Sequence, residues 1–181
     1  RITSTTLPSR TNKTMSPPNE NRLMRYRTMT INDYEAAIAL WSESQGVRLR
    51  DADSREGIEK YLLRNPGLSF VAELEGEGES KEGDRNQERA GELVGTIMAG
   101  HDGKRGYVQH LSVSHTHRRL GIATQLVSLC LEALKNEGIL KSHLMILPEN
   151  EAAQRFWASQ GWAYRSDILL YSFVNGDNHN V

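Results

Sequence analysis

The stretch LSVSHTHRRLGIAT, residues 111–124, decides the fold and carries the first functional hypothesis. It begins as the end of a strand pattern, continues through the polar loop 114–119, and reaches a glycine that precedes an amphipathic helical pattern. A helix N-terminus offers unpaired backbone N–H groups and the positive end of the helix dipole, so it attracts anions such as phosphate. The order of strand, basic loop and helix start therefore predicts an anion-binding turn.

The residues of this turn fit a phosphate group but exclude two common phosphate motifs. Arg118 and Arg119 add positive charge, Gly121 lets the backbone approach closely, and Ala123 keeps the next position small. No Lys-Ser or Lys-Thr follows the glycine and no G-x-G-x-x-G is present, so neither a nucleoside-triphosphate loop nor a dinucleotide fingerprint is predicted. By spacing alone, an ordinary tight turn between a strand and a helix explains the pattern equally well.

The patterns on both sides of this turn predict a mixed α/β (α+β) protein. Strands are predicted at residues 24–29, 69–75, 92–100, 107–113, 142–147, 162–164 and 168–174. Helices are predicted after Thr30, after Ser54, from Gly121 to Asn136 and over residues 150–160. The order β-α-α-β-β-β-α-β-α-β-β predicts a central mixed, mostly antiparallel sheet of six to seven strands with helices on both faces.

Three segments fall outside the predicted domain, which spans residues 24–175. Residues 1–23 contain few large apolar side chains and are predicted to be a disordered extension, whose basic and hydroxyl-rich character is also compatible with organellar import. Residues 76–91 are Gly-rich and charged, which predicts a flexible loop insertion within the domain. Residues 176–181 form a polar C-terminal tail.

Composition narrows the classes of partner. The chain has 181 residues, 22 Lys and Arg against 23 Asp and Glu, and a net charge of −1, so no global field attracts nucleic acid or anionic lipid. The single cysteine, Cys130, excludes an intramolecular disulfide, and His115 and His117 lack the further ligands of a zinc site. We therefore expect a soluble, cytoplasmic protein with no metal ion and no nucleic-acid or membrane partner.

Two motifs carry a resemblance to a known family. Residues 118–123, RRLGIA, resemble the (Gln/Arg)-x-x-Gly-x-(Gly/Ala) signature of the GNAT superfamily of acyl-CoA-dependent N-acetyltransferases. Residues 150–162, NEAAQRFWASQGW, resemble that superfamily's N-x-x-A-x-x-F-Y-x-x-x-G-F/W helix. Residues 95–107 are similar to a bacterial subgroup of small predicted acetyltransferases. The resemblance covers residues 24–175 and implies a GNAT-like fold with acetyl-CoA as co-substrate and no metal.

The resemblance also implies where acetyl-CoA binds. Its pantetheine amides would pair with the strand edge at Leu111, Ser112 and Val113, where this strand splays from the strand over 142–147. Its pyrophosphate would meet the turn formed by Arg118, Arg119, Leu120, Gly121, Ile122, Ala123 and Thr124. Asn150 would contact the pantetheine arm, and Phe156 and Trp157 would begin the wall around the thioester.

The catalytic acid and base are not matched by the resemblance. Relatives use a Glu or His on the strand over 107–113 or a Glu on the strand over 142–147, where this sequence has Tyr107, Gln109 and Met145. Trp157 replaces the tyrosine that protonates departing CoA in relatives.

The remaining candidates for proton transfer are Tyr107, His110 and Tyr164. Strand alternation puts His110 on one face with Val108 and Ser112 and opposite Gln109, and a packed histidine is the alternative to a base there. Tyr164 falls in the predicted closing hairpin, where a buried aromatic residue is the alternative to a proton donor.

The expected function is direct transfer of an acetyl group from acetyl-CoA to the primary amine of a small molecule, amino acid or protein N-terminus. The alternative is an acyl-CoA-binding regulatory module that lost turnover, because Trp157, Met145 and Gln109 depart from the family pattern. A pure interaction domain is a third hypothesis. The acceptor is a small-molecule or peptide amine, and both a monomer and a homodimer fit the sequence.

Overall fold

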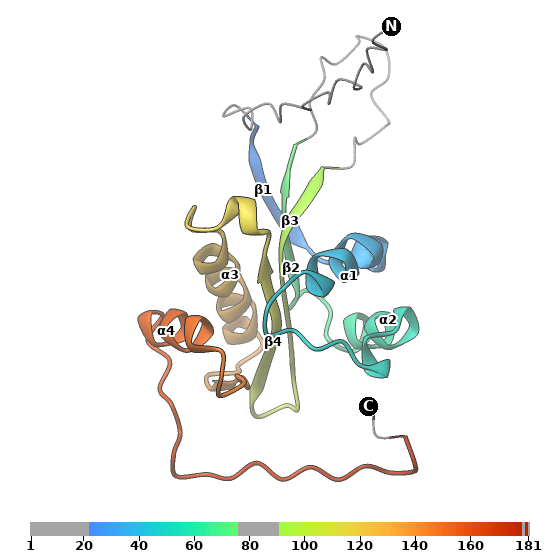
Figure 1. The fold of residues 1–181 in the computed structure, drawn as a ribbon, viewed down its shortest axis with the longest axis vertical. Coiled ribbons are helices and arrows are strands. Elements are labelled where there is room, and N and C mark those ends of the chain that lie inside the picture. The colour runs from blue at the N-terminus through green and yellow to red at the C-terminus, as the bar shows by residue number, and fades with distance from the viewer. Residues whose placement is uncertain (1–21, 76–90, 179, 181) are drawn as a thin grey trace, which may run out of the picture.

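The computed structural model describes residues 22–75, 91–178 and 180. One sheet contains β1 (Met24–Thr28), β2 (Phe70–Leu74), β3 (Glu92–His101), β4 (Gly106–Val113) and β5 (Ser142–His143), in the order β1-β2-β3-β4-β5. The first four strands are antiparallel to their neighbours, whereas β5 is parallel to β4. The sheet forms the central layer of the molecule (Figure 1).

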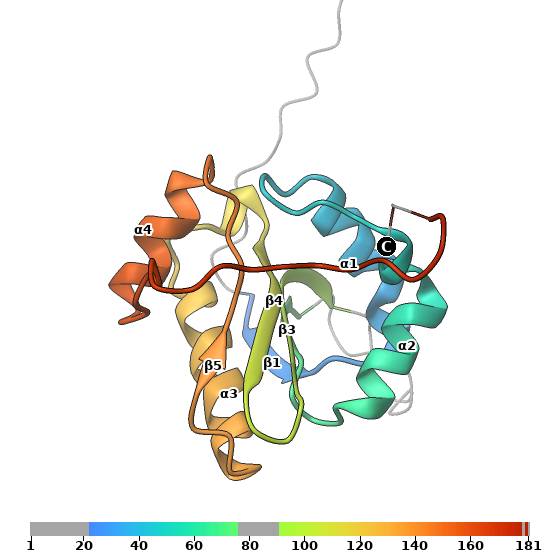
Figure 2. The ribbon, with the colours of Figure 1, turned by 90° about the horizontal axis from the view of Figure 1, so that it is seen from below.

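Helices cover both faces of the sheet, as the sequence predicts. They are α1 (Tyr34–Ser42), α2 (Arg55–Arg64), α3 (Ile122–Asn136) and α4 (Glu151–Ser159), with short 3-10 helices η1 (Ile31–Asp33), η2 (Asp51–Asp53) and η3 (His115–His117). Figure 2 shows α1 and α2 on one side of the sheet and α3 and α4 on the other. Two of the predicted helices begin at side-chain caps, where the Ser54 hydroxyl accepts from Gly57 N and the Asn150 Oδ1 accepts from Ala153 N.

The two faces of the sheet bury separate apolar clusters. On the α3 side, Ile97, Leu126 and Leu134 are fully buried, and on the α1 and α2 side, Trp41 and Met98 are fully buried. Burying one such side chain contributes about 1.5–3 kcal/mol to folding. The sheet is therefore held between two apolar layers, which fixes the position of β4 for the functions described below.

A β-bulge interrupts β4. Thr96 pairs with Ser112, and Met98 pairs with Gln109. Between these two pairs, the single residue Ile97 of β3 lies opposite two residues of β4, His110 and Leu111. His110 adopts the left-handed backbone conformation, with φ of 52°. Its carbonyl accepts a 2.9 Å hydrogen bond from the Thr96 hydroxyl, which in turn accepts a 2.8 Å hydrogen bond from Trp41 Nε1. These buried hydrogen bonds hold the bulge in place.

β4 and β5 diverge soon after they meet. They pair only through Gly106 with Ser142 and Tyr107 with His143. From Val108 to Val113, the edge of β4 that faces away from β3 has no strand partner in the part of the chain that the structure describes. Apart from the Val113 carbonyl, which accepts a hydrogen bond from Arg118 Nε, the backbone N–H and C=O groups along this edge are therefore available to another chain or ligand.

The strand count and the closing hairpin were predicted wrongly. The described residues form five strands rather than six or seven, and the strand expected over residues 142–147 is only Ser142–His143. The expected strands over 162–164 and 168–174 do not form, and Tyr164, Tyr171 and Phe173 are exposed. A strand depends on hydrogen bonds to a neighbour, and these stretches lie beside no strand within the described ranges.

The end of the C-terminal segment returns to η2. Beyond α4 the chain runs as an extended segment from the α4 side of the sheet to the α2 side (Figures 1 and 2). Asn178 Nδ2 and Asn180 Nδ2 donate hydrogen bonds of 2.7 and 2.6 Å to the Asp51 carboxylate. This contact ties the segment to the same short turn that carries Asp53.

Two predicted segments cannot be compared with the structure. Most of the predicted extension over residues 1–23 and nearly all of the predicted insertion over 76–91 lie outside the described residues. No helix in the described ranges is long and apolar enough to cross a membrane.

Candidate active site

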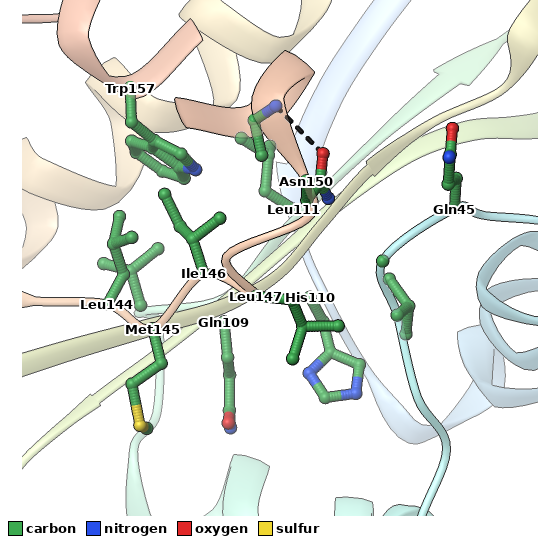
Figure 3. A pocket seen from close by; sticks show the side chains of 14 residues that line it. Gln45, Gln109, His110, Leu111, Leu144, Met145, Ile146, Leu147, Asn150 and Trp157 are labelled. Atoms are coloured by element: carbon green, nitrogen blue, oxygen red, sulfur yellow. Dashed lines mark hydrogen bonds between the residues drawn. The ribbon is translucent and has the colours of Figure 1, made fainter. Parts of the chain in front are cut away.

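A cleft with a volume of about 110 Å³ opens where β4 and the chain after β5 diverge. It lies between residues 108–111 of β4 and residues 144–147, with the loop 45–47 at one wall. At α4 it is closed by Asn150, Ala153 and Trp157 (Figure 3). The cleft thus follows the unpaired edge of β4, and β4 leads from it directly into the loop before α3.

The loop before α3 is open to an anion. Gly121 caps α3 in the left-handed conformation with φ of 79°, and Arg119 is also left-handed with φ of 64°. The backbone N–H groups of residues 121–124 donate to no acceptor within the described residues. A Cβ added to Gly121 would meet no atom within 4 Å. The predicted turn therefore presents free N–H groups and the positive end of α3 toward open space.

The basic side chains of the loop lie beside this helix start. The Arg118 Nε donates a 3.3 Å hydrogen bond to the carbonyl of Val113, the last residue of β4. Arg119 and Leu120 are exposed, whereas Ile122 is buried under the sheet. The two arginines thus place positive charge between the end of β4 and the start of α3.

Asn150 connects α4 with the cleft. Its Oδ1 accepts the 3.0 Å hydrogen bond from Ala153 N that caps α4, which leaves its Nδ2 as a possible donor at the cleft wall. The Nδ2 lies against Gly46, where any Cβ would collide with it. Gly46 also has φ of 88°, which favours glycine. A side chain at residue 46 would therefore displace the Asn150 amide from its present position.

The bulge turns His110 toward α1 and η2. Its ring contacts Trp41 edge to face at a centroid distance of 4.3 Å, and its Nε2 lies 2.9 Å from Asp53 Oδ1. Ser112 shares this face, as the alternation predicted, because its hydroxyl donates to Ser44 Oγ at 2.6 Å. Gln109 shares it too, whereas Val108 packs on the α3 side, so the prediction that His110 lies with Val108 and opposite Gln109 is wrong (Figure 3). The extra residue at the bulge breaks the period of two.

Burial lowers the pKa of His110, and the nearby Asp53 carboxylate partly offsets this effect. The side chains of His110 and Asp53 are 14% and 12% exposed. A histidine with a lowered pKa is neutral at pH 7, so it can accept a proton without first losing one. His110 therefore has the protonation state that a general base needs.

The other candidates for proton transfer lie outside the residues that line the cleft. The Tyr107 hydroxyl donates to Asp102 Oδ2 at 3.4 Å, at the hairpin end of β4, and Tyr164 is 92% exposed. Their predicted catalytic roles stay predictions.

The aromatic wall at α4 is packed. Trp157 is buried and makes edge-to-face contacts with Phe156 and Trp162 at centroid distances of 5.3 and 4.9 Å. Cys130 of α3 is buried in the same apolar cluster as Trp157, and burial raises the pKa of its thiol to about 12. The cysteine therefore belongs to the core.

Comparison with known proteins identifies the family. The family model "Acetyltransferase (GNAT) family" matches residues 34–162. The chain belongs to this family. It is 31% identical to an acetyltransferase of Sodalis glossinidius over 147 residues, 81% of this chain and 92% of that protein. It is 34% identical to an acetyltransferase of Pectobacterium atrosepticum over 129 residues, 71% of this chain and 80% of that protein. The protein is a GNAT-type N-acetyltransferase, which confirms the resemblance drawn from the two motifs.

Solved structures share the fold. The crystal structure of Ard1 from Thermoplasma volcanium superposes with a TM-score of 0.64 at 17% identity, covering 79% of this chain and 84% of that one. AAC(6')-Iy, solved with a bisubstrate analogue of CoA and acetylneamine, gives a TM-score of 0.60 at 20% identity, covering 84% of this chain and 99% of that one. The mixed α/β architecture predicted from the sequence is thus confirmed, apart from the strand count.

Proposed function

We propose that this GNAT protein transfers an acetyl group from acetyl-CoA directly to the primary amine of a small molecule. The observation that carries the proposal is the continuous path from the unpaired edge of β4, along the cleft, to the free N–H groups before α3. An extended ligand with amide groups at one end and phosphates at the other fits this order of sites. We infer that the acetyl donor is acetyl-CoA from this fit and from the family to which the chain belongs.

Each part of acetyl-CoA has a matching part of the protein in this proposal. Residues 111–113 pair with the pantetheine amides, and residues 118–124 receive the pyrophosphate. Asn150 offers its Nδ2 to the pantetheine arm, and Phe156 and Trp157 border the thioester. Support for a small amine as the acceptor comes from structural neighbours, because AAC(6')-Iy is solved with an acetylneamine analogue and a diaminobutyrate acetyltransferase of Paenibacillus lautus is solved with diaminobutyric acid and CoA.

The reaction needs a group that removes a proton from the acceptor. An alkyl ammonium with a pKa of about 10 is only about 0.1% neutral at pH 7. The free amine attacks the thioester carbonyl, the new N–C bond forms, and the C–S bond breaks as CoA leaves. Of the three predicted candidates, His110 is the one that lines the cleft, and its lowered pKa leaves the imidazole able to accept a proton, so we assign it the role of general base.

A melting experiment with acetyl-CoA, followed by thiol release in the same samples, tests this function. A ligand at about 100 times its Kd stabilises the folded protein by about 2.7 kcal/mol, so saturating acetyl-CoA should raise the Tm by several degrees. Thiol release is expected with at least one member of a panel of aminoglycosides, diamino acids and a peptide N-terminus. Absence of a Tm shift contradicts the proposal, and a shift without release favours the regulatory acyl-CoA-binding module.

The substitution Gly46→Ala is expected to raise the Kd for acetyl-CoA by about tenfold. The new Cβ collides with Asn150 Nδ2 and forces this amide away from the cleft, and tenfold corresponds to about 1.4 kcal/mol. Isothermal titration calorimetry gives the Kd. Gly103→Ala is the control, because Gly103 also has a positive φ, of 91°, but meets no atom within 4 Å. Equal Kd values for the two variants would mean that Asn150 does not contact acetyl-CoA.

A further inference from the structure

Asp53 is held in one orientation by its surroundings. Its Oδ2 accepts a 2.8 Å hydrogen bond from the backbone N–H of Arg50, and its carbonyl accepts a 3.0 Å hydrogen bond from the Tyr34 hydroxyl. The other carboxylate oxygen, Oδ1, is thereby turned toward His110 and lies 2.9 Å from Nε2. The Asp53 carboxylate is thus a fixed acceptor beside one nitrogen of the imidazole ring.

The His110 ring has little freedom to turn away. Its backbone is fixed at the bulge through Thr96, and its ring packs against Trp41. Nε2 is fully enclosed and has no hydrogen bond of good geometry within the described residues, so its polar contact is the 2.9 Å approach of Asp53 Oδ1. The ring edge that carries Nδ1 faces the side of Gln109 and Leu147 in the cleft (Figure 3).

We infer that Asp53 is a positioning residue, which keeps the His110 proton on Nε2 so that Nδ1 accepts the proton of the acceptor ammonium. A carboxylate only accepts hydrogen bonds, so the approach of Oδ1 is favourable when Nε2 carries a hydrogen. In a neutral imidazole, the other nitrogen then has a free lone pair. The inference rests on the proposed function and adds a residue that the sequence motifs do not indicate.

The proton balance of the step is simple. The acceptor ammonium gives its first proton to Nδ1 of His110, and the imidazolium so formed is stabilised by the adjacent Asp53 carboxylate. The neutral amine attacks the thioester carbonyl. Its second proton, released as the amide forms, goes to the CoA thiolate that leaves. His110 then returns the first proton to solvent.

The other groups around His110 do not supply the negative charge that stabilises the imidazolium. α1 contributes Trp41, β3 contributes Thr96 and β4 contributes Gln109, all of which are uncharged. α2 contributes Tyr61 near Gln109, and burial raises the pKa of Tyr61 to about 12, so it stays neutral. In the described part of the chain, the charge that faces His110 is therefore the carboxylate of Asp53 on η2.

The substitution Asp53→Asn tests the inference, because an amide can present its NH₂ group to Nε2 and so favour the opposite tautomer. We expect kcat to fall by about 10²–10⁴-fold and the acidic limb of kcat/KM to move to lower pH, since a raising influence on the His110 pKa is lost. Asp51→Asn is the matched control on the same turn, because Asp51 contacts Asn178 and Asn180 rather than His110. Its kcat should stay within about threefold of the wild type.

Long-range ¹H–¹⁵N spectra of the histidine rings give a readout that needs no turnover. The signals of His110 are those lost in His110→Gln. The wild type is expected to carry the proton on Nε2, and Asp53→Asn to carry it on Nδ1. A wild-type ring protonated on Nδ1, or an unchanged kcat in folded Asp53→Asn, overturns the inference. If the wild type acetylates no amine, the proposed function fails instead, while the spectra still report on the contact between Asp53 and His110.

Discussion

Replacing His110 with glutamine is expected to lower kcat by about 10²–10⁴-fold, the usual contribution of a general base. The glutamine amide cannot take a proton from the acceptor ammonium at neutral pH. The Kd for acetyl-CoA should change by less than about threefold, because the proposed pyrophosphate site at Gly121 and the cap at Asn150 do not involve the ring. Steady-state kinetics and calorimetry measure the two effects separately.

The pH dependence separates a base from a merely packed histidine. Because burial lowers the pKa of His110, the acidic limb of the wild-type kcat/KM profile should lie below pH 6.5, whereas kcat/KM of His110→Gln should keep rising with pH up to the pKa of the acceptor amine. The loss of kcat/KM in His110→Gln should shrink at higher pH and with acceptors of lower pKa. In both cases more of the acceptor is already present as the free amine. A deficit that is constant across pH and acceptor pKa would assign His110 a role in packing only.

A second variant controls for the unusual backbone of the bulge. His110 has φ of 52°, a conformation that asparagine tolerates better than glutamine. His110→Asn should therefore fold with less strain and show the same loss of kcat. Wild-type activity in folded His110→Asn would contradict the assignment of His110 as the base.

The parts of the fold that the sequence predicts correctly depend on nearby residues. The cap at Ser54 bonds to Gly57, three residues away, and the cap at Asn150 bonds to Ala153 at the same spacing. The helical pattern from Ile122 to Asn136 is likewise a local property of the chain. Such features appear in the sequence because their causes lie within one helical turn.

The β4 bulge and the Asp53 contact have distant causes, so the sequence does not reveal them. The bulge depends on Trp41 and Thr96, which are 55 residues apart in the chain and meet only in the folded protein. Asp53 stands in a polar turn that the pattern indicates only as a helix start. Its contact with His110 forms because η2 packs beside the bulge, and no spacing between the two residues predicts this.

The predicted strands that do not form also show that distant contacts decide the structure. Residues 168–174 have the composition of a strand, with Ile168, Tyr171 and Phe173 among them, yet they form none because no strand lies beside them in the described part of the chain. β-propensity is a preference for a pleated, half-buried surface rather than for an isolated extended chain. The tertiary partner, which the sequence does not specify locally, decides whether such a stretch pairs.

The substitution Gly121→Glu is expected to raise the Kd for acetyl-CoA at least about 100-fold, or about 2.7 kcal/mol, while the protein stays folded. A side chain here meets no protein atom within 4 Å, so it occupies the open space before α3 where we place the pyrophosphate. The added carboxylate repels the phosphates and opposes the favourable field of the helix N-terminus. Calorimetry with acetyl-CoA gives the Kd, and a melting curve reports on folding.

Two further variants separate strain, bulk and charge. Gly138→Glu is the matched control for strain, because Gly138 lies just beyond the other end of α3 with φ of 78° and also meets no atom within 4 Å. It should lower the Tm about as much as Gly121→Glu and leave the Kd unchanged. Gly121→Gln keeps the bulk without the charge and should bind acetyl-CoA more tightly than Gly121→Glu, with the difference shrinking in 1 M salt because the Debye length falls to about 3 Å. Wild-type affinity in folded Gly121→Glu would mean that the pyrophosphate binds elsewhere, and the path from β4 to α3 would then lose its proposed role.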